Sequence, residues 1–234
     1  MDRKLIKQNA KQAFRMRYWP IVGIELLAGV LAGSGSTASF SSNLNNDNLK
    51  QAMDQPVVRE ITIAALWIGA LLALAGMAYL FLFGNVIRVG ISGIRLSAYR
   101  QQGFQFRDLF KYLKQYGRIV GAMALTTLNI MIGIFIFIVP GIIAAYGLFE
   151  VPFLLAENPD LTPMETMRRS WADMKGFKGK LFGLHLSFFG WIVLTVLTFG
   201  VLAAFYTGPY MALSEAGFYL ERQQMRAAEQ IADN

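Results

Sequence analysis

The side chains most able to do chemistry in this sequence are two glutamates and one histidine within apolar stretches. Glu25 and Glu150 are surrounded mainly by apolar residues, and His185 is the only histidine in the chain. A carboxylate at membrane depth must be protonated, paired or hydrated, which makes such a residue a candidate site. We add Asn129, which lies on a polar stripe, and obtain a candidate intramembrane polar site of Glu25, Glu150, Asn129 and His185.

Enzymatic and metal chemistry have little support in the residue types present. The absence of cysteine excludes thiolate nucleophiles, thiolate metal sites and disulfides, and a single histidine excludes a multi-histidine metal centre. Ser187 is only two residues from His185 and would face another side of a helix, so no Ser/His/Asp arrangement is expected. We expect no enzyme activity, no metal and no cofactor.

The composition is that of a membrane protein. Of the 234 residues 55% are hydrophobic and 16% are charged, with a mean hydropathy of +0.41. Soluble domains have roughly 45–50% apolar and about 25% charged residues. We therefore expect an all-α protein with a single integral membrane domain over residues 1–234.

Six apolar segments are expected to be membrane helices. They cover residues 20–33, 61–83, 119–139, 142–156, 181–199 and 201–220. A membrane helix needs about 20 apolar residues, with roughly 17–25 tolerated, so the first and fourth segments are short. A signal peptide is the alternative for the first segment, although Glu25 interrupts its apolar run.

The distribution of basic residues predicts the orientation of these spans. With six spans, 20 of the 22 lysines and arginines fall on one side, and only Lys50 and Arg59 fall on the other. The positive-inside rule then places both termini in the cytoplasm and the protein in a bacterial cell membrane as a multi-pass protein. The net charge of +7 is attributed to contacts with anionic inner-leaflet lipid, and nucleic acid is not expected as a partner.

Four segments are expected outside the spans. Residues 1–19 and 85–118 resemble cytoplasmic amphipathic helices, residues 34–60 a flexible outer loop, and residues 157–180 a cytoplasmic loop. Arg88, Arg95 and Arg100 are the candidate lipid-facing basic residues of the second amphipathic segment.

The spans are expected to pair as three in-out-in hairpins with tight outer turns. One turn is predicted at residues 139–141 and another around Gly200. Similar Gly-Ala-rich starts of the fourth and sixth segments indicate a weak repeat, for which shared composition is the alternative explanation. Pro152 is expected to free the carbonyl of Leu148, four residues earlier, and so to place polar backbone near Glu150.

The C-terminal half resembles a known family. The residues that carry the resemblance are Pro140-Gly141-Ile142, Glu157-Asn158-Pro159, Ser170, Met174-Lys175-Gly176, Lys180-Leu181-Phe182, Leu186-Ser187-Phe188, Gly190-Trp191, Gly200, Pro209-Tyr210 and Phe218-Tyr219. This pattern is similar to the domain of unknown function 975 family. The resemblance implies a bacterial integral membrane protein, and it assigns no activity and no functional residue. An oxygenase activity of the carotene-cleaving type is sometimes assigned to proteins of this kind. It would need several iron-binding histidines, whereas this chain has one histidine.

Two functions are compatible with these features. We expect a non-enzymatic membrane scaffold or accessory subunit that acts through contacts with anionic lipid, with protein partners or with further copies of itself. The alternative is a permease or channel for a small or amphiphilic solute that uses the buried carboxylates. A continuous polar path through the membrane would favour transport, whereas lipid-facing helices and helix interfaces rich in small residues would favour a scaffold.

Overall fold

The protein is helical throughout the part of the chain that the structure describes. This computed structural model describes residues 3–31, 56–79 and 83–232, and no strand occurs in them. The α-helices are α1 (Arg3–Met16), α2 (Tyr18–Leu31), α4 (Pro56–Tyr79), α5 (Asn85–Tyr99), α6 (Tyr116–Ile136), α7 (Ile138–Gly147), α8 (Val151–Glu157), α9 (Pro163–Asp173), α10 (Lys178–Leu186), α11 (Phe189–Leu197) and α12 (Gly208–Ala232). A 3₁₀-helix, η2 (Phe106–Gln115), precedes α6, and a short π-helix, η3 (Ala203–Thr207), precedes α12. The expected all-α class is confirmed.

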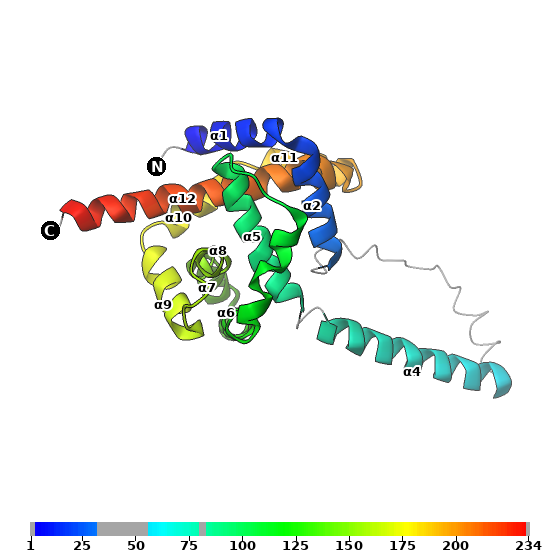
Figure 1. Cartoon of the computed structure of the whole chain (residues 1–234). Helices are drawn as coiled ribbons and strands as arrows, with labels where there is room; N and C mark the ends of the chain where they lie inside the picture. The colour runs from blue at the N-terminus through cyan, green and yellow to red at the C-terminus, as the bar shows by residue number, and fades with distance from the viewer. Residues whose placement is uncertain (1–2, 32–55, 80–82, 233–234) are drawn as a thin grey trace.

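Helix α5 lies at the centre of the bundle (Figure 1). It packs against α8, α12, η2 and α2, and it buries residues on most of its sides, among them Val86, Val89, Ile91 and Ile94. This differs from the surface helix expected for residues 85–118. The physical reason is that its apolar residues are not confined to one stripe, so the helix can contact neighbours all around.

Helices α1 and α12 pack along each other on one side of the bundle (Figure 1). The apolar face of α1 is buried, and Ile6, Ala10 and Phe14 share a hydrophobic cluster with Leu213 and Phe218 of α12. The segment expected to lie on lipid therefore covers another helix with its apolar face. Lys7 of α1 donates to the carbonyl of Ser187, whereas Lys4, Lys11 and Arg15 are exposed.

Helices α6 and α7 form a close hairpin. Its turn is at Phe137, whose backbone is extended, so Pro140 falls in the first turn of α7 and not in the predicted turn at residues 139–141. The two backbones touch at Gly133 and Gly141, since a Cβ on Gly133 would lie 2.9 Å from the Cα of Gly141. The turn before η3 is where it was expected, and there Phe199 and Gly200 both have positive φ. The two turns thus differ in conformation.

In the part of the chain that the structure describes, fewer helices than expected are suited to cross a membrane. By length and composition, residues 106–136 and residues 138–157 qualify, and α10 with α11 forms a third candidate that is bent by 40°. Helix α4 has 24 residues, and its apolar stretch among the described residues is Trp67–Tyr79. The six expected spans and their three hairpins are therefore not supported by the described helices. Helix α2 has 14 residues, and η3 interrupts the last segment.

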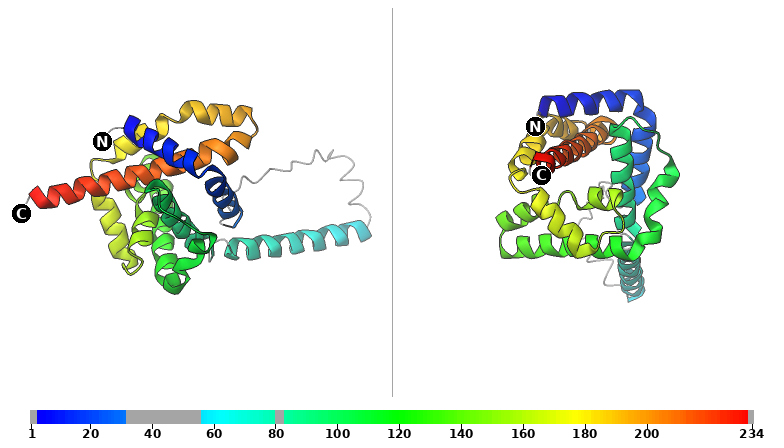
Figure 2. Two further views of the ribbon diagram at one scale, coloured as in Figure 1. Left: turned by 45° about the horizontal axis from the view of Figure 1, so that its top comes forward. Right: turned by 60° about the vertical axis from the view of Figure 1, so that its left-hand side comes forward.

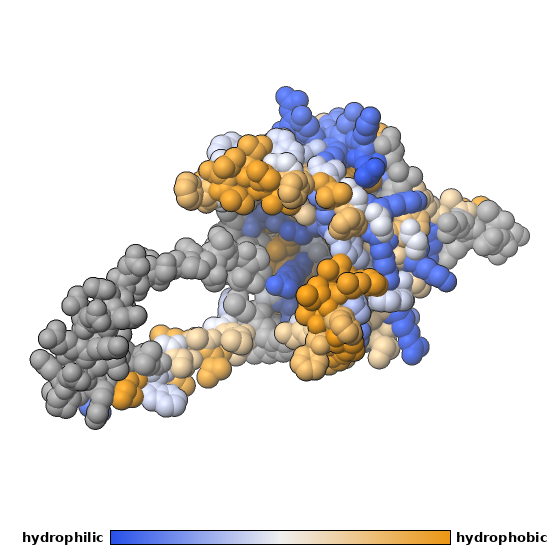
Figure 3. All heavy atoms as spheres, turned by 180° about the vertical axis from the view of Figure 1, so that it is seen from behind, coloured by the Kyte–Doolittle hydropathy of each residue, from blue (hydrophilic) through white to orange (hydrophobic). Residues whose placement is uncertain are grey.

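Apolar side chains are exposed at two connections between helices, the α6–α7 turn and the turn between α11 and η3. Phe135 beside the α6–α7 turn is 94% exposed, and Phe199 before η3 is 98% exposed. Figure 3 shows two separate hydrophobic areas, one over α11 and η3 and one over the α6–α7 hairpin, with hydrophilic surface between them. Helix α4 extends away from the other helices (Figure 2), and Trp67, Leu72 and Met77 are exposed along it. Exposed apolar surface on this scale indicates contact with lipid or with another protein.

Part of the expected organisation falls outside the described residues. Of the expected outer loop at residues 34–60, residues 34–55 are not described, and the same holds for Gly33 at the end of the first expected span.

Candidate functional site

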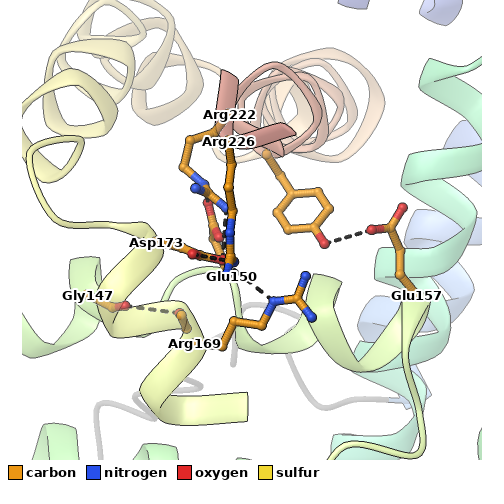
Figure 4. Close-up of polar contacts among 9 residues, drawn as sticks. Gly147, Glu150, Glu157, Arg169, Asp173, Arg222 and Arg226 are labelled. Carbon is orange, nitrogen blue, oxygen red and sulfur yellow. Dashed lines mark hydrogen bonds and ion pairs between the residues drawn. The ribbon is translucent and has the colours of Figure 1, made fainter. Parts of the chain in front are cut away.

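Two glutamate–arginine interactions dominate the polar interior. The first, which we call the arginine–carboxylate network, consists of Glu150, Arg169, Asp173, Arg222 and Arg226 (Figure 4). Glu150 immediately precedes α8, Arg169 and Asp173 are on α9, and Arg222 and Arg226 are on α12. The two α12 arginines are four residues apart and so share one helix face. The network therefore joins three helices.

The contacts in the network are short and largely shielded from solvent. The Nε of Arg222 donates to Oε1 of Glu150 at 2.5 Å, and its Nη2 lies 2.9 Å from Oδ2 of Asp173. The Nη1 of Arg226 donates to Oδ1 of Asp173 at 2.5 Å. Glu150 is 0% exposed, Arg222 3% and Asp173 7%. Buried charges of this kind persist only when they are paired, so each member depends on the others.

Two polar contacts extend the network on α9 and α12. The Oγ of Ser170 donates to the carbonyl of Gly147 at 3.0 Å and ties α9 to the end of α7. The hydroxyl of Tyr219 donates to Oε2 of Glu157 at 2.8 Å, and Arg100 forms an ion pair with the same carboxylate. Arg100, at the end of α5, is thus held at the junction of α8 and α12.

The second glutamate–arginine pair links α2 to α5. The Nε and Nη2 of Arg95 donate to the two carboxylate oxygens of Glu25 at 2.7 and 2.9 Å, a bidentate arrangement. Burial alone would lower the pKa of Arg95, but the charge of Glu25 and its hydrogen bond raise this pKa above its usual value. Arg95 is therefore a permanent cation that is matched by one carboxylate.

A comparison of the sequence with models of known protein families finds a match. The model described as "Protein of unknown function (DUF975)" matches residues 16–226. The chain belongs to this family. The match includes all five residues of the arginine–carboxylate network and the Glu25–Arg95 pair. No curated protein and no solved structure matches the chain.

The four residues of the predicted intramembrane site do not come together. Glu25 and Glu150 have different arginine partners on different helices, and Asn129 is exposed on α6. His185 forms a third polar group, in which Nδ1 is 3.1 Å from the hydroxyl of Tyr146 and Nε2 is 3.2 Å from Oε1 of Glu215. The described residues contain no cluster of three or more His, Cys, Asp or Glu side chains able to hold a metal ion.

The carbonyl of Leu148, which Pro152 was expected to leave free, has a hydrogen-bond partner in the structure. Pro152 lies in the first turn of α8, because a break at residues 148–150 separates this helix from α7. The carbonyl of Leu148 accepts a hydrogen bond from the backbone N–H of Val151 at 3.2 Å. The polar partner of Glu150 is therefore the Arg222 side chain and not a free backbone carbonyl.

Sequence reasoning missed Arg222, the partner of Glu150, and Asp173, the second carboxylate that Arg222 contacts. One signal for Arg222 was present: it follows Leu213, Ala216 and Tyr219 at three-residue steps, and all four are buried on α12. An arginine in register with an apolar stripe must reach a buried carboxylate or a solvent path. Asp173 offers no comparable pattern, since its position becomes special only when α9 packs beside α12.

Proposed function

We propose that this protein is a non-enzymatic scaffold or accessory subunit of a bacterial cell membrane that acts through lipid and protein contacts. The observation that supports this best is that Glu25 and Glu150 are each paired with an arginine. Both were candidates for binding a transported ion. The Nε of Arg95 lies 2.7 Å from Oε1 of Glu25, and the Nε of Arg222 lies 2.5 Å from Oε1 of Glu150. A carboxylate paired with a guanidinium joins two helices, and in this proposal that is its role in place of binding a transported cation.

The exposed surface supports contact functions. The apolar tips of the α6–α7 hairpin and of the α11–η3 turn are not covered by other described residues. Polar surface separates the two tips from each other (Figure 3). In our proposal these tips and α4 lie in the bilayer, with the N-terminus, α9 and the C-terminus on the cytoplasmic side. Arg88 is exposed on α5, and in this proposal it contacts anionic lipid.

Reconstitution into lipid vesicles separates a scaffold from a permease. We expect vesicles that contain the purified protein to show no proton, potassium or ethidium flux above that of protein-free vesicles, with ionophores as the positive control. The reason is that the two candidate carboxylates are already neutralised by arginine. Flux that disappears in Glu25→Gln or Glu150→Gln would contradict the scaffold and establish the permease.

The same preparation has a positive readout for the scaffold. When the protein is extracted with its surrounding membrane into nanodiscs, we expect anionic phospholipid to be enriched relative to the bulk membrane, as measured by lipid mass spectrometry. An Arg88→Gln variant, which removes one exposed cation, should reduce this enrichment. Lipid identical to the bulk membrane for the parent protein would remove lipid contact from the proposal.

A further inference from the structure

A basic cavity lies between α9 and α12, next to the arginine–carboxylate network. It has a volume of about 780 Å³, and its lining includes Arg168, Arg169 and Arg226. Among the described residues of the lining, the acidic one is Glu165. Asp173 pairs with Arg169 and Arg226, so among the described side chains three arginines face two carboxylates. The excess of positive charge makes an anion the ligand that the cavity walls favour.

Several donors around the cavity have no hydrogen-bond acceptor in the described structure. Arg168 has no ion pair or side-chain hydrogen bond among the described residues, and it is exposed. The Nε of Arg169 and the Nε2 of Gln223 are buried without a hydrogen-bond partner in the described structure. Asp173 is shared by Arg169, Arg222 and Arg226, at 3.8, 2.9 and 2.5 Å. The exposed guanidinium of Arg168 and the unpaired donor atoms of Arg169 and Gln223 are therefore the groups that an anion with several oxygens would engage.

The first turn of α9 adds to the same preference. Thr162 caps this helix, because its Oγ1 accepts from the N–H of Glu165 at 3.3 Å, and the Glu165 carboxylate in turn accepts from the Thr162 hydroxyl. The Glu165 carboxylate is thus held by the Thr162 hydroxyl and forms no ion pair with the described arginines of the cavity. The positive end of the helix dipole also faces this region, alongside the arginines.

We infer that this cavity binds a phosphate group, either as the head of an anionic phospholipid or as a free phosphate compound. Guanidinium groups match the oxygens of phosphate in charge and in geometry. The inference deepens the proposed function, since it names the ligand class of the lipid contacts. In the orientation proposed above, α9 and the end of α12 are cytoplasmic, so the cavity lies at the height of inner-leaflet headgroups.

Three matched substitutions test the site. Arg168→Gln removes the unpaired guanidinium and should weaken phosphate binding by about tenfold or more, since hydrogen bonds to charged groups are worth roughly 1.5–3 kcal/mol. Glu165→Gln removes the opposing charge while the glutamine side-chain oxygen can still accept from the Thr162 hydroxyl, and it should strengthen binding. Arg107→Gln, an exposed arginine on η2, changes the net charge equally and should have no effect.

Two measurements on the full-length protein distinguish the two sources of phosphate. One is calorimetric titration in detergent with inorganic phosphate. The other is native mass spectrometry of retained phosphatidylglycerol, with phosphatidylcholine as the neutral comparison. Phosphate binding that follows the order Glu165→Gln, parent, Arg168→Gln identifies a free phosphate site. Retention of phosphatidylglycerol in that order, without binding of inorganic phosphate, identifies a lipid headgroup site.

Equal behaviour of Arg168→Gln and Arg107→Gln in both measurements would overturn the inference. That outcome would leave the vesicle flux result untouched, so the failure of the cavity and the failure of the scaffold are separable. All three positions are on helix surfaces or in the cavity wall, and none belongs to the buried Glu150–Arg222 pair. Circular dichroism of each variant confirms that the fold is retained before binding is compared.

Discussion

Replacing Arg222 with methionine is expected to destabilise the protein by about 3–5 kcal/mol, the cost typical of leaving a buried charge without its partner. Glu150 is fully buried and accepts its hydrogen bond from the Arg222 Nε, so the substitution strands its carboxylate. Asp173 keeps Arg226 and Arg169 as partners. The loss therefore falls mainly on Glu150. Equilibrium unfolding in detergent, followed by circular dichroism, measures it.

Two further variants make this prediction specific. The double variant Arg222→Met/Glu150→Gln removes both charges and should recover much of the lost stability, because no buried ion is left unpaired. The control is Arg118→Met, which breaks the exposed pair with Asp160 and should cost at most about 1 kcal/mol. If Arg222→Met unfolds at the same denaturant concentration as the parent, Arg222 does not stabilise Glu150 and the network is not a structural lock.

Alanine at Gly90 is the second substitution with a large expected effect. A Cβ there would lie 2.3 Å from the carbonyl oxygen of Leu109 and 2.8 Å from its Cα. These are backbone atoms, so η2 would have to move away from α5, the central helix. Overpacking of this kind costs about 1–3 kcal/mol. The same unfolding measurement in detergent detects it.

Gly23 provides the matched control for Gly90. A Cβ on Gly23 in α2 would meet no atom within 4 Å, so alanine there should be neutral or stabilise the helix by up to about 1 kcal/mol. If Gly90→Ala and Gly23→Ala have equal stability, the close approach of α5 and η2 is not a feature of the folded protein.

The class of fold could be predicted from composition, whereas the number of spans could not. Long uncharged runs predict helices in a membrane protein, and the described chain is helical. Hydropathy does not reveal, however, that an apolar run breaks at Ser187 and Phe188, or that a π-helix interrupts the last segment. Such breaks depend on local hydrogen bonds, for example from the Ser187 hydroxyl to the carbonyl of Leu184.

The glutamates of the candidate site could be predicted from the sequence, whereas their arginine partners could not. Burial of a carboxylate in an apolar segment marks Glu25 and Glu150, because the cost of an isolated charge makes a partner necessary. The partners Arg95 and Arg222 are 70 and 72 residues away along the chain. Sequence spacing therefore gives no indication of them, and Arg95 in particular was assigned to lipid. Pairings of this range are set by tertiary packing of α2 on α5 and of α12 beside α8.

Membrane integration with the basic side in the cytoplasm is tested most directly by labelling single cysteines in intact cells. The parent chain has no cysteine, and Gln102 and Lys175 are exposed in the structure. With an impermeant maleimide we expect Ser39→Cys, in the expected outer segment, to react in intact cells. Gln102→Cys and Lys175→Cys should react only after the membrane is permeabilised. Labelling of Lys175→Cys in intact cells would contradict the proposed orientation, and with it the placement of the arginine cavity at the inner leaflet.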